Sequence, residues 1–201
     1  MSRHPGRPDS VTFVAGARGS GKSSWLKQYA RGFGRVLVWD PMNEYGAALQ
    51  VAAVRRPSGL VAALGDPVVV FSPEIINSNL FDFFSECAYR RGPGLVLVDE
   101  LATVTHAGKA SGWWGRLIRE GRHQKTEIAA AAQRPAEIDK TILGNATRLV
   151  VFRLGRLIDR KLMAAELDID RKQIDVLEPL EFLDADRLTR KLTKSHIVFA
   201  R

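Results

Sequence analysis

The sequence predicts an α/β fold with a mostly parallel central sheet flanked by helices. Three observations point to this fold. Short, continuous apolar runs recur along the chain, segments with helical patterning separate most of them, and a glycine-rich loop joins the first apolar run to the first helix. Continuous apolar runs are typical of strands that are buried on both faces of a parallel sheet. Their alternation with helices is the pattern of a doubly wound fold.

The expected elements follow one another in a regular order. The first strand lies at 11–16 and ends in glycine, and the helix after it begins at Lys22 and is closed by Gly32 or Gly34. Further strands are expected at 35–41, 67–73 and 94–100, with two more candidates at 127–135 and 147–154. Helical patterns lie near 45–64, 78–91 and 111–122.

Two segments are less clear from the pattern. The alanine run 129–132 is compatible with a helix, because alanine is the best helix former, although we favour a strand there. After about residue 155 the pattern becomes helical and charged, with one short last strand expected around 196–200.

The chain is expected to fold as one domain. Its 201 residues, of which 45% are hydrophobic and 26% charged, are enough to bury one sizeable core. We expect a flexible lead-in over 1–9, because this stretch is polar and contains proline, and a single domain over 10–201. Within that domain, the core covers about 10–155 and a C-terminal helical region covers about 156–201.

Composition indicates what kind of binding partner and which cellular compartment to expect. The formal net charge of +8 and the pI near 10.0 indicate an anionic partner, and we favour nucleic acid over acidic lipid. The only cysteine, Cys87, cannot form an internal disulfide, which fits a reducing, cytosolic compartment. Cys87 recurs at helical spacing with Phe81 and Phe84, so we expect a core position. No apolar run is long enough to span a membrane, and the first ten residues lack the apolar segment of a signal peptide.

The loop after the first strand has the sequence of a phosphate-binding loop. Residues 16–23 read GARGSGKS and fit the pattern G-x-x-x-x-G-K-[ST]. Glycines let the backbone N–H groups point at phosphate oxygens, and the following helix places its positive dipole end there. Lys22 is expected to reach the β and γ phosphates of ATP, and Ser23 to hold Mg²⁺. The expected nucleotide-binding residues are Gly16, Ala17, Arg18, Gly19, Ser20, Gly21, Lys22, Ser23, Ser24 and Asp99.

Two adjacent carboxylates, Asp99 and Glu100, end the apolar run at 94–100. An acid at the end of such a strand can bind Mg²⁺, and a second acid can deprotonate or orient the attacking water. The pair therefore favours ATP hydrolysis, with Ser23 and Asp99 as the metal residues and Glu100 as the catalytic carboxylate. The alternative is that both acids are solvated and cap the next helix. A base-reading N-K-x-D motif of GTPases does not occur.

Four segments together resemble a known family. In chain order they read GARGSGKSS, VLVWDPMNEYG, LVLVDE and GRHQKTEIAAAAQRP, and they span roughly residues 10–160. They resemble the FtsK/HerA superfamily of DNA-translocating ATPases, whose core is a RecA/FtsK-like P-loop NTPase of the ASCE class. Within it, the chain most resembles the genome-packaging ATPases of tailless, membrane-containing icosahedral viruses.

The resemblance implies two further catalytic residues. Gln133 matches the family's glutamine that senses the γ phosphate, and an amide suits this task because it both donates and accepts hydrogen bonds without adding charge. Arg122 matches the arginine finger that one subunit inserts into its neighbour's site. Arg119 and Arg148 are alternative fingers, and the alternative for Gln133 is a turn cap before Pro135.

Three other residues of the matched motifs have less defined roles. Asp40 and Glu44 match positions near the nucleotide pocket, although Asp-Pro also opens turns. His123 belongs to the pattern, but we expect a structural role for it.

The implied function is a motor. The resemblance predicts an ATPase that assembles as a homo-oligomeric ring, expected to be a hexamer, and drives double-stranded DNA into a preformed viral capsid. Capsid or portal-vertex proteins are further expected partners, and the expected location is the host cytoplasm, with the virion as a second location. Cellular relatives carry membrane spans or an N-terminal barrel, whereas only about ten residues precede the first expected strand, which favours the viral branch.

The DNA-contacting surface is the least defined part of this prediction. Lys109, Arg116 and Lys125 are candidates for contacts with DNA phosphates. Trp113 and Trp114 offer aromatic rings for stacking on DNA, but neighbouring positions on a helix point about 100° apart, so we expect at least one to pack in the core or against a subunit.

Three other functions share the phosphate loop. Filamentous-phage assembly ATPases that resemble zonula occludens toxin use the same core to extrude virions and usually carry a membrane span. A small-molecule kinase would need a substrate pocket and an arginine-bearing lid. A nucleotide-binding switch without hydrolysis is the third alternative.

Overall fold

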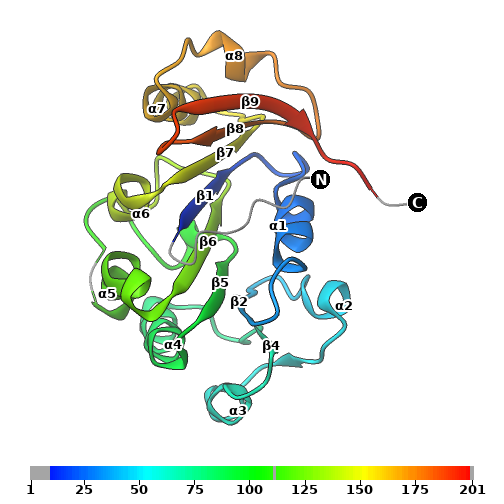
Figure 1. Cartoon of the computed structure of the whole chain (residues 1–201), viewed down its shortest axis with the longest axis vertical. Coiled ribbons are helices and arrows are strands. Elements are labelled where there is room, and N and C mark those ends of the chain that lie inside the picture. The colour runs from blue at the N-terminus through cyan, green and yellow to red at the C-terminus, as the bar shows by residue number, and fades with distance from the viewer. Residues whose placement is uncertain (1–9, 111, 200–201) are drawn as a thin grey trace.

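The fold is built on one nine-stranded sheet with helices on both faces (Figure 1). The computed structural model describes residues 10–110 and 112–199, so the lead-in expected over 1–9 lies outside the described residues. The strand order is β3-β4-β2-β5-β6-β1-β7-β8-β9. The strands are β1 Val11–Ala15, β2 Val36–Trp39, β3 Ala53–Val54, β4 Val68–Phe71, β5 Gly94–Val98, β6 Thr126–Ala132, β7 Arg148–Phe152, β8 Glu181–Asp186 and β9 Lys191–His196.

Strands β1 to β7 run parallel, and β8 and β9 extend the sheet antiparallel beyond β7. In the centre of the sheet, Val14 of β1 lies between Ala131 of β6 and Val150 of β7. All five residues of β1 and all seven of β6 are buried, which is why these segments read as continuous apolar runs in the sequence. The expectation of a mostly parallel sheet flanked by helices is confirmed.

The helices cover the two faces of the sheet unequally. Their bounds are α1 Lys22–Ala30, α2 Gly46–Leu49, α3 Pro57–Ala63, α4 Ser78–Arg91, α5 Gly112–Glu120, α6 Lys140–Asn145, α7 Leu157–Leu167 and α8 Lys172–Asp175, with 3-10 turns η1 Leu101–Thr103 and η2 Gly121–Gln124. Helices α3 to α7 pack on one face through the buried residues Leu60, Phe84, Leu117, Ile142 and Met163. Helix α1 covers the other face, where Trp25 and Leu26 are buried.

Several predictions from the sequence are confirmed by this packing. The alanine run 129–132 is strand, because it pairs with β5 and β1 on its two sides and its side chains are buried on both faces of the sheet. Cys87 is buried with Phe81 and Phe84 on the inner side of α4. Burial raises the pKa of the Cys87 thiol, which fits a core role for this side chain.

The segment 45–64, expected as one helical pattern, forms two short helices with strand β3 between them. Helix α2 ends where Gln50 takes a left-handed backbone conformation, with φ of 59°, and α3 begins again at Pro57. Proline lacks the N–H that a continuing helix would need, although it fits the first turn of a new one.

The described part of the C-terminal region, 156–199, is only partly helical, which corrects the sequence-based prediction. Helices α7 and α8 are followed by the β8–β9 hairpin. The last strand of the described residues lies at Lys191–His196, and 197–199, part of the strand expected around 196–200, are not strand. All six residues of β9 are exposed, so this edge strand is held by backbone pairing with β8 and leaves no apolar pattern in the sequence. In the described part of the chain, no helix has both the length and the apolar composition needed to traverse a lipid bilayer.

Candidate nucleotide-binding site

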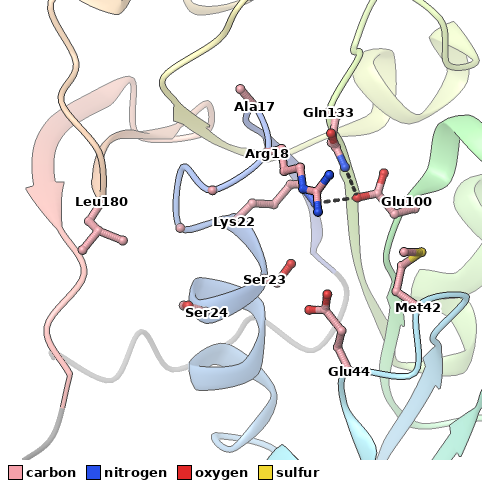
Figure 2. Close-up of a pocket in the computed structure, with 12 residues that line it drawn as sticks. Ala17, Arg18, Lys22, Ser23, Ser24, Met42, Glu44, Glu100, Gln133 and Leu180 are labelled. Carbon is pink, nitrogen blue, oxygen red and sulfur yellow. Dashed lines mark hydrogen bonds and ion pairs between the residues drawn. The ribbon is translucent and has the colours of Figure 1, made fainter.

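The candidate site lies at the carboxyl edge of the sheet, where three motif segments meet. Strands β5, β6 and β1 are direct neighbours, so their carboxyl ends bring Glu100, Gln133 and the phosphate loop together. They border a pocket of about 550 Å³ (Figure 2). The pocket is lined by Ala17, Arg18, Gly19, Gly21, Lys22, Ser23, Ser24, Met42, Glu44, Glu100, Gln133 and Leu180.

The phosphate loop has the conformation that its glycines permit. Gly19 and Gly21 adopt φ of 73° and 110°, values that side chains disfavour. At Gly16, a Cβ would lie 2.5 Å from the Ser20 Oγ and 2.9 Å from the Phe152 Cβ, so only glycine fits. The loop is thus tightly wound between β1 and α1.

The backbone donors of this loop are free to bind an anion. Within residues 10–110 and 112–199, no hydrogen bond of the protein engages the backbone N–H groups of Gly19, Gly21, Lys22, Ser23 and Ser24. The Ser20 Oγ is also buried without a hydrogen-bond partner. A row of unpaired N–H groups at the start of a helix fits the oxygens of a polyphosphate.

Lys22 is a buried cation that is held by carboxylates. Its side-chain nitrogen lies 3.1 Å from an Asp99 oxygen and 3.3 Å from a Glu100 oxygen, and the residue is only 4% exposed. Burial acts to lower the pKa of Lys22, but the two carboxylates outweigh it and raise the pKa above its ordinary value. Lys22 therefore stays charged, and the phosphates of a nucleotide could take the place of these carboxylates.

Asp99 is the centre of the hydrogen bonds beneath the pocket. The Ser23 hydroxyl donates to its carboxylate across 3.3 Å and the Tyr45 hydroxyl across 2.7 Å, while the Glu100 backbone N–H donates across 2.9 Å. Tyr45 had no role among the predictions from the sequence, because its contact with Asp99 depends on the fold of the loop after β2. This contact and burial raise the pKa of the Tyr45 hydroxyl, with burial as the larger cause.

Ser23 and Asp99 have the donor chemistry that Mg²⁺ prefers. A hydroxyl oxygen and a carboxylate oxygen lie side by side at the edge of the phosphate loop. In the described part of the chain, no group of three or more His, Cys, Asp or Glu residues could hold a metal by itself. Mg²⁺ commonly binds through one or two protein oxygens together with substrate phosphates, so the residues present fit a metal that arrives with a nucleotide.

Glu100 and Gln133 form the polar wall at one end of the pocket. The Gln133 amide nitrogen donates to a Glu100 carboxylate oxygen across 2.5 Å (Figure 2). Glu100 has a left-handed φ of 51°, a strained conformation for a residue that is not glycine, and such strain is common at functional sites. Both side chains line the pocket, and their roles as catalytic carboxylate and amide sensor stay predictions.

The two acids of the loop after β2 have different positions. Asp40 is buried, accepts the N–H groups of Glu44 and Tyr45 across 2.9 and 2.8 Å, and does not line the pocket. Burial raises the pKa of the Asp40 carboxyl. Glu44 does line the pocket and forms an ion pair of 3.1 Å with Lys27. Asp40 therefore holds the loop in place, and only Glu44 is exposed to a ligand.

Leu180, which the sequence analysis did not identify, lines the other end of the pocket. Its backbone N–H donates to the Ser20 carbonyl across 3.0 Å, and its own carbonyl accepts the Ile197 N–H across 2.9 Å. Figure 2 shows Leu180 across the phosphate loop from Glu100 and Gln133. The residue just before the C-terminal hairpin thus contributes a pocket wall. No local motif predicts a contact between residues so distant in sequence.

Arg122 lies at the opposite edge of the sheet from the pocket. It is in η2, immediately before β6, whereas Gln133 immediately follows that strand. Arg122 is exposed, and its guanidinium forms no hydrogen bond or ion pair with any described residue. A seven-residue strand at about 3.3 Å per residue separates the two ends, so Arg122 does not reach the pocket of its own subunit.

The two alternative candidates for the arginine finger, Arg148 and Arg119, differ in their contacts with the rest of the subunit. Arg148 donates to both carboxylate oxygens of Asp184, across 2.9 and 2.7 Å, and its guanidinium lies over the rings of Trp25 and Tyr29. These contacts hold Arg148 within its own subunit and explain its presence without a finger role. Arg119 is exposed, as is Arg122.

The neighbouring surface residues also have defined positions. Trp114 is buried and donates to Asp139 across 3.0 Å, which confirms that one of the two tryptophans packs in the core. Trp113 is half-buried, with the guanidinium of Arg116 over its ring. Exposed basic or ionisable side chains are present at Lys109, Arg116, His123 and Lys125.

Comparisons with known proteins agree with this architecture. No family model matches the chain. Protein P9 of Pseudoalteromonas phage PM2 is 33% identical over 181 residues, which cover 87% of this chain and 82% of that protein.

Solved structures of other proteins share the fold of this chain. The genome packaging NTPase B204 from Sulfolobus turreted icosahedral virus 2, in complex with ATP-gammaS, has a TM-score of 0.80 at 15% identity, covering 96% of this chain and all of that one. VirB4 of Thermoanaerobacter pseudethanolicus has a TM-score of 0.65 at 10% identity, covering 94% of this chain and 89% of that one. At these identities the likeness shows the fold, and it confirms the P-loop ATPase architecture that the motifs predicted.

Proposed function

This chain belongs to the same family as Protein P9 of Pseudoalteromonas phage PM2, and from this premise we propose that it is an ATPase that packages double-stranded viral DNA into a preformed capsid. The proposal is supported by the fold it shares with the genome packaging NTPase B204. One observation supports the proposed ATPase activity. The phosphate loop, with its unpaired N–H groups and Lys22, lines the same pocket as the Glu100–Gln133 pair.

The phosphates of ATP bind to the unpaired N–H groups of the loop and to Lys22. Binding releases the Lys22 ammonium from Asp99 and Glu100, because phosphate oxygens offer it a stronger negative charge. Ser23 and Asp99 hold Mg²⁺, which when bound neutralises charge on the phosphate oxygens.

Hydrolysis then uses the end of the pocket at Glu100 and Gln133. Glu100 accepts a proton from water as the water oxygen bonds to the γ phosphorus, and the bond from that phosphorus to the bridging oxygen breaks to release ADP. Gln133 orients this water through its amide, without adding charge to the site.

The neighbouring subunit completes the site through Arg122. This guanidinium is exposed and faces away from its own pocket, a position that suits a contact with the nucleotide of another copy. Such a contact repeats from copy to copy and closes into a ring, for which we propose six subunits. The motor is proposed to work in the host cytoplasm at the capsid, with capsid or portal-vertex proteins as partners.

The direct test is ATP hydrolysis and duplex movement by the purified chain. Release of one phosphate for each ADP formed, without any acceptor molecule, is expected of an ATPase, while a kinase would need an acceptor. Addition of duplex DNA should stimulate the rate, and ATP should drive displacement of a third strand bound to the duplex. Hydrolysis that never responds to DNA under conditions of ring assembly would refute the motor.

A further inference from the structure

A second hollow, outside the nucleotide pocket, has a basic lining. It has a volume of about 430 Å³ and is lined by Gly108, Lys109, Lys140, Thr141, Gly144 and Asn145. We call this hollow the lysine groove. Its lining contains no acidic residue, and neither lysine forms an ion pair within residues 10–110 and 112–199. Both lysines are exposed, so two positive charges face outward without a partner in the described protein.

The lysine groove is built from two segments that begin at the nucleotide pocket. One segment runs from Glu100 through η1 to Lys109, and the other runs from Gln133 to Lys140 at the start of α6. These two segments meet again at the groove. The Lys140 backbone N–H donates to the Gly108 carbonyl across 2.7 Å, and the Ala110 N–H donates to the Thr141 hydroxyl across 2.8 Å.

This construction connects the groove to the nucleotide pocket. Glu100 and Gln133 are hydrogen-bonded to each other in the structure, and both line the pocket where the γ phosphate is proposed to bind. Both segments therefore start at side chains that a bound nucleotide would contact. The hydrogen bonds at Gly108 and Thr141 hold the far ends of the two segments together, next to the two lysines.

The chemistry of the groove suits a phosphate backbone. Lysine ammonium groups bind phosphate oxygens as point charges, and they do so without reading bases. The space in front of Gly108 and Gly144 is open, since a Cβ added at either residue would meet no other atom within 4 Å. A DNA backbone could therefore approach the protein backbone closely here. The lining lacks the aromatic or large apolar side chains that stack on the bases of single strands. These features favour duplex DNA, which presents its phosphates on the outside.

We propose that the lysine groove binds the phosphate backbone of duplex DNA, with Lys109 and Lys140 as the contact residues. The inference rests on the proposed function, since it assigns the DNA-binding surface of the proposed motor. Lys109 was one of three basic candidates in the sequence, and the structure adds Lys140 as its partner. The other two candidates differ: Arg116 is paired with Glu120, and Lys125 lies at the opposite edge of the sheet, before β6.

The test compares two double variants of the full chain that lose the same charge. The groove variant, Lys109→Ala with Lys140→Ala, removes both positive charges of the lysine groove. The control variant, Lys161→Ala with Lys172→Ala, removes two exposed lysines of α7 and α8. Binding to a fluorescent duplex is measured by anisotropy at several salt concentrations, and ATP hydrolysis is measured with and without that duplex. Thermal unfolding by circular dichroism confirms that both variants are folded.

The groove variant should bind the duplex at least about tenfold more weakly than the control in low salt, and its salt slope should fall by about 2 because two phosphate contacts are lost. Its hydrolysis without DNA should equal that of the wild type, and stimulation by DNA should be lost. Replacement of both lysines by arginine should restore binding.

The outcomes separate this inference from the proposed function. If the wild type binds and responds to DNA while the groove variant behaves as the control does, the groove assignment is wrong and the motor stands. If the wild type hydrolyses ATP but neither binds nor responds to duplex, the motor itself fails. Equal weakening in the groove variant and the control would show a nonspecific charge effect and would also overturn the groove assignment.

Discussion

The Gln133 amide donates a hydrogen bond of 2.5 Å to the Glu100 carboxylate, and this bond joins the ends of the adjacent strands β6 and β5. The same Glu100 oxygen accepts the Lys22 ammonium across 3.3 Å. One carboxylate oxygen is therefore held by an amide and by a cation at once. We propose that a bound γ phosphate would compete for both donors and thereby free Glu100 to accept a proton from water.

Replacement of Gln133 tests the role of the amide. We expect Gln133→Ala to lower kcat about 100-fold with little change in KM, because the amide chiefly orients the attacking water in the transition state, while Lys22 and the loop N–H groups provide most of the binding of the phosphates in the ground state. Steady-state hydrolysis over a range of ATP concentrations measures both constants. Gln124→Ala, at the other end of β6, is the matched control and should remain active. A rise in KM with unchanged kcat would contradict the assignment.

Substitutions at Glu100 and at Lys22 should impair different steps, hydrolysis and nucleotide binding. Glu100→Gln keeps the size of the side chain and removes the base, so we expect ATP binding near the wild-type affinity with hydrolysis reduced by about 1,000-fold. Lys22→Ala removes the buried cation and should abolish nucleotide binding or hydrolysis. A fluorescent ATP analogue measures binding separately from phosphate release. Normal hydrolysis by Glu100→Gln would remove this residue from the base role.

Complementation tests Arg122 as a finger that acts in the neighbouring subunit. Arg122→Ala and Glu100→Gln should each be inactive alone, whereas mixed assemblies should regain part of the activity, because some sites then receive an intact Glu100 and an intact Arg122. The readout is hydrolysis as a function of the mixing ratio. Arg119→Ala, mixed in the same way, tests the alternative exposed arginine.

The mixing experiment needs proof that the two variants assemble together. Differently tagged variants and copurification supply it. Absence of any recovery in assemblies that are shown to be mixed would argue against a finger contributed by the neighbour.

Ionisation of the Tyr45 hydroxyl should lower the free energy of unfolding at alkaline pH. Its hydroxyl donates to Asp99 across 2.7 Å, and burial together with the Asp99 charge raises its pKa well above the ordinary 10.0. The stabilisation from the protonated hydroxyl is complete below pH 10.0 and is lost as the pH rises toward the higher folded-state pKa. We therefore expect the free energy of unfolding of the wild type to fall above pH 10.

Tyr45→Phe provides the comparison. At pH 8 it should reduce the free energy of unfolding by about 2 kcal/mol, because a buried hydrogen bond to a carboxylate is lost. Above pH 10 its stability should fall less steeply than that of the wild type. Urea unfolding at pH 8 to 11.5 measures both effects. Tyr89→Phe, which removes a partly buried hydroxyl that donates to Glu120, should cost less at pH 8. Parallel pH curves for Tyr45→Phe and the wild type would contradict the prediction.

Leu180 should affect nucleotide binding and leave the chemical step unchanged. It lines the pocket across the phosphate loop from Glu100 and Gln133. We expect Leu180→Ala to raise KM for ATP several-fold with kcat nearly unchanged, because the lost apolar contact is made equally in the ground and transition states. Leu188→Ala, an exposed leucine in the β8–β9 turn, is the matched control and should leave both constants unchanged. A fall in kcat alone would show a different role.

Much of the fold could be predicted from local pattern. The buried strands β1, β5 and β6 read as apolar runs because both of their faces are covered, and the phosphate loop reads directly because its conformation demands glycines at fixed positions. The exposed strand β9 could not be predicted, since it is stabilised by pairing with β8 and buries no alternating side chains. The break of 45–64 into two helices was missed because the strand between them, β3, has only two residues and is held by pairing with β4.

The sequence alone determined which chemical groups the site contains: the phosphate loop, Lys22, the pair Asp99 and Glu100, and Gln133. The phosphate loop with Lys22 and the pair Asp99 and Glu100 are local motifs, whereas Gln133 was assigned through the family resemblance of four segments. Only the tertiary structure decided which groups meet, because strand order and strand direction place residues that are far apart in the chain. The order β5-β6-β1 brings Gln133 to Glu100, the direction of β6 carries Arg122 to the opposite edge, and the hairpin beyond β7 brings Leu180 over the phosphate loop.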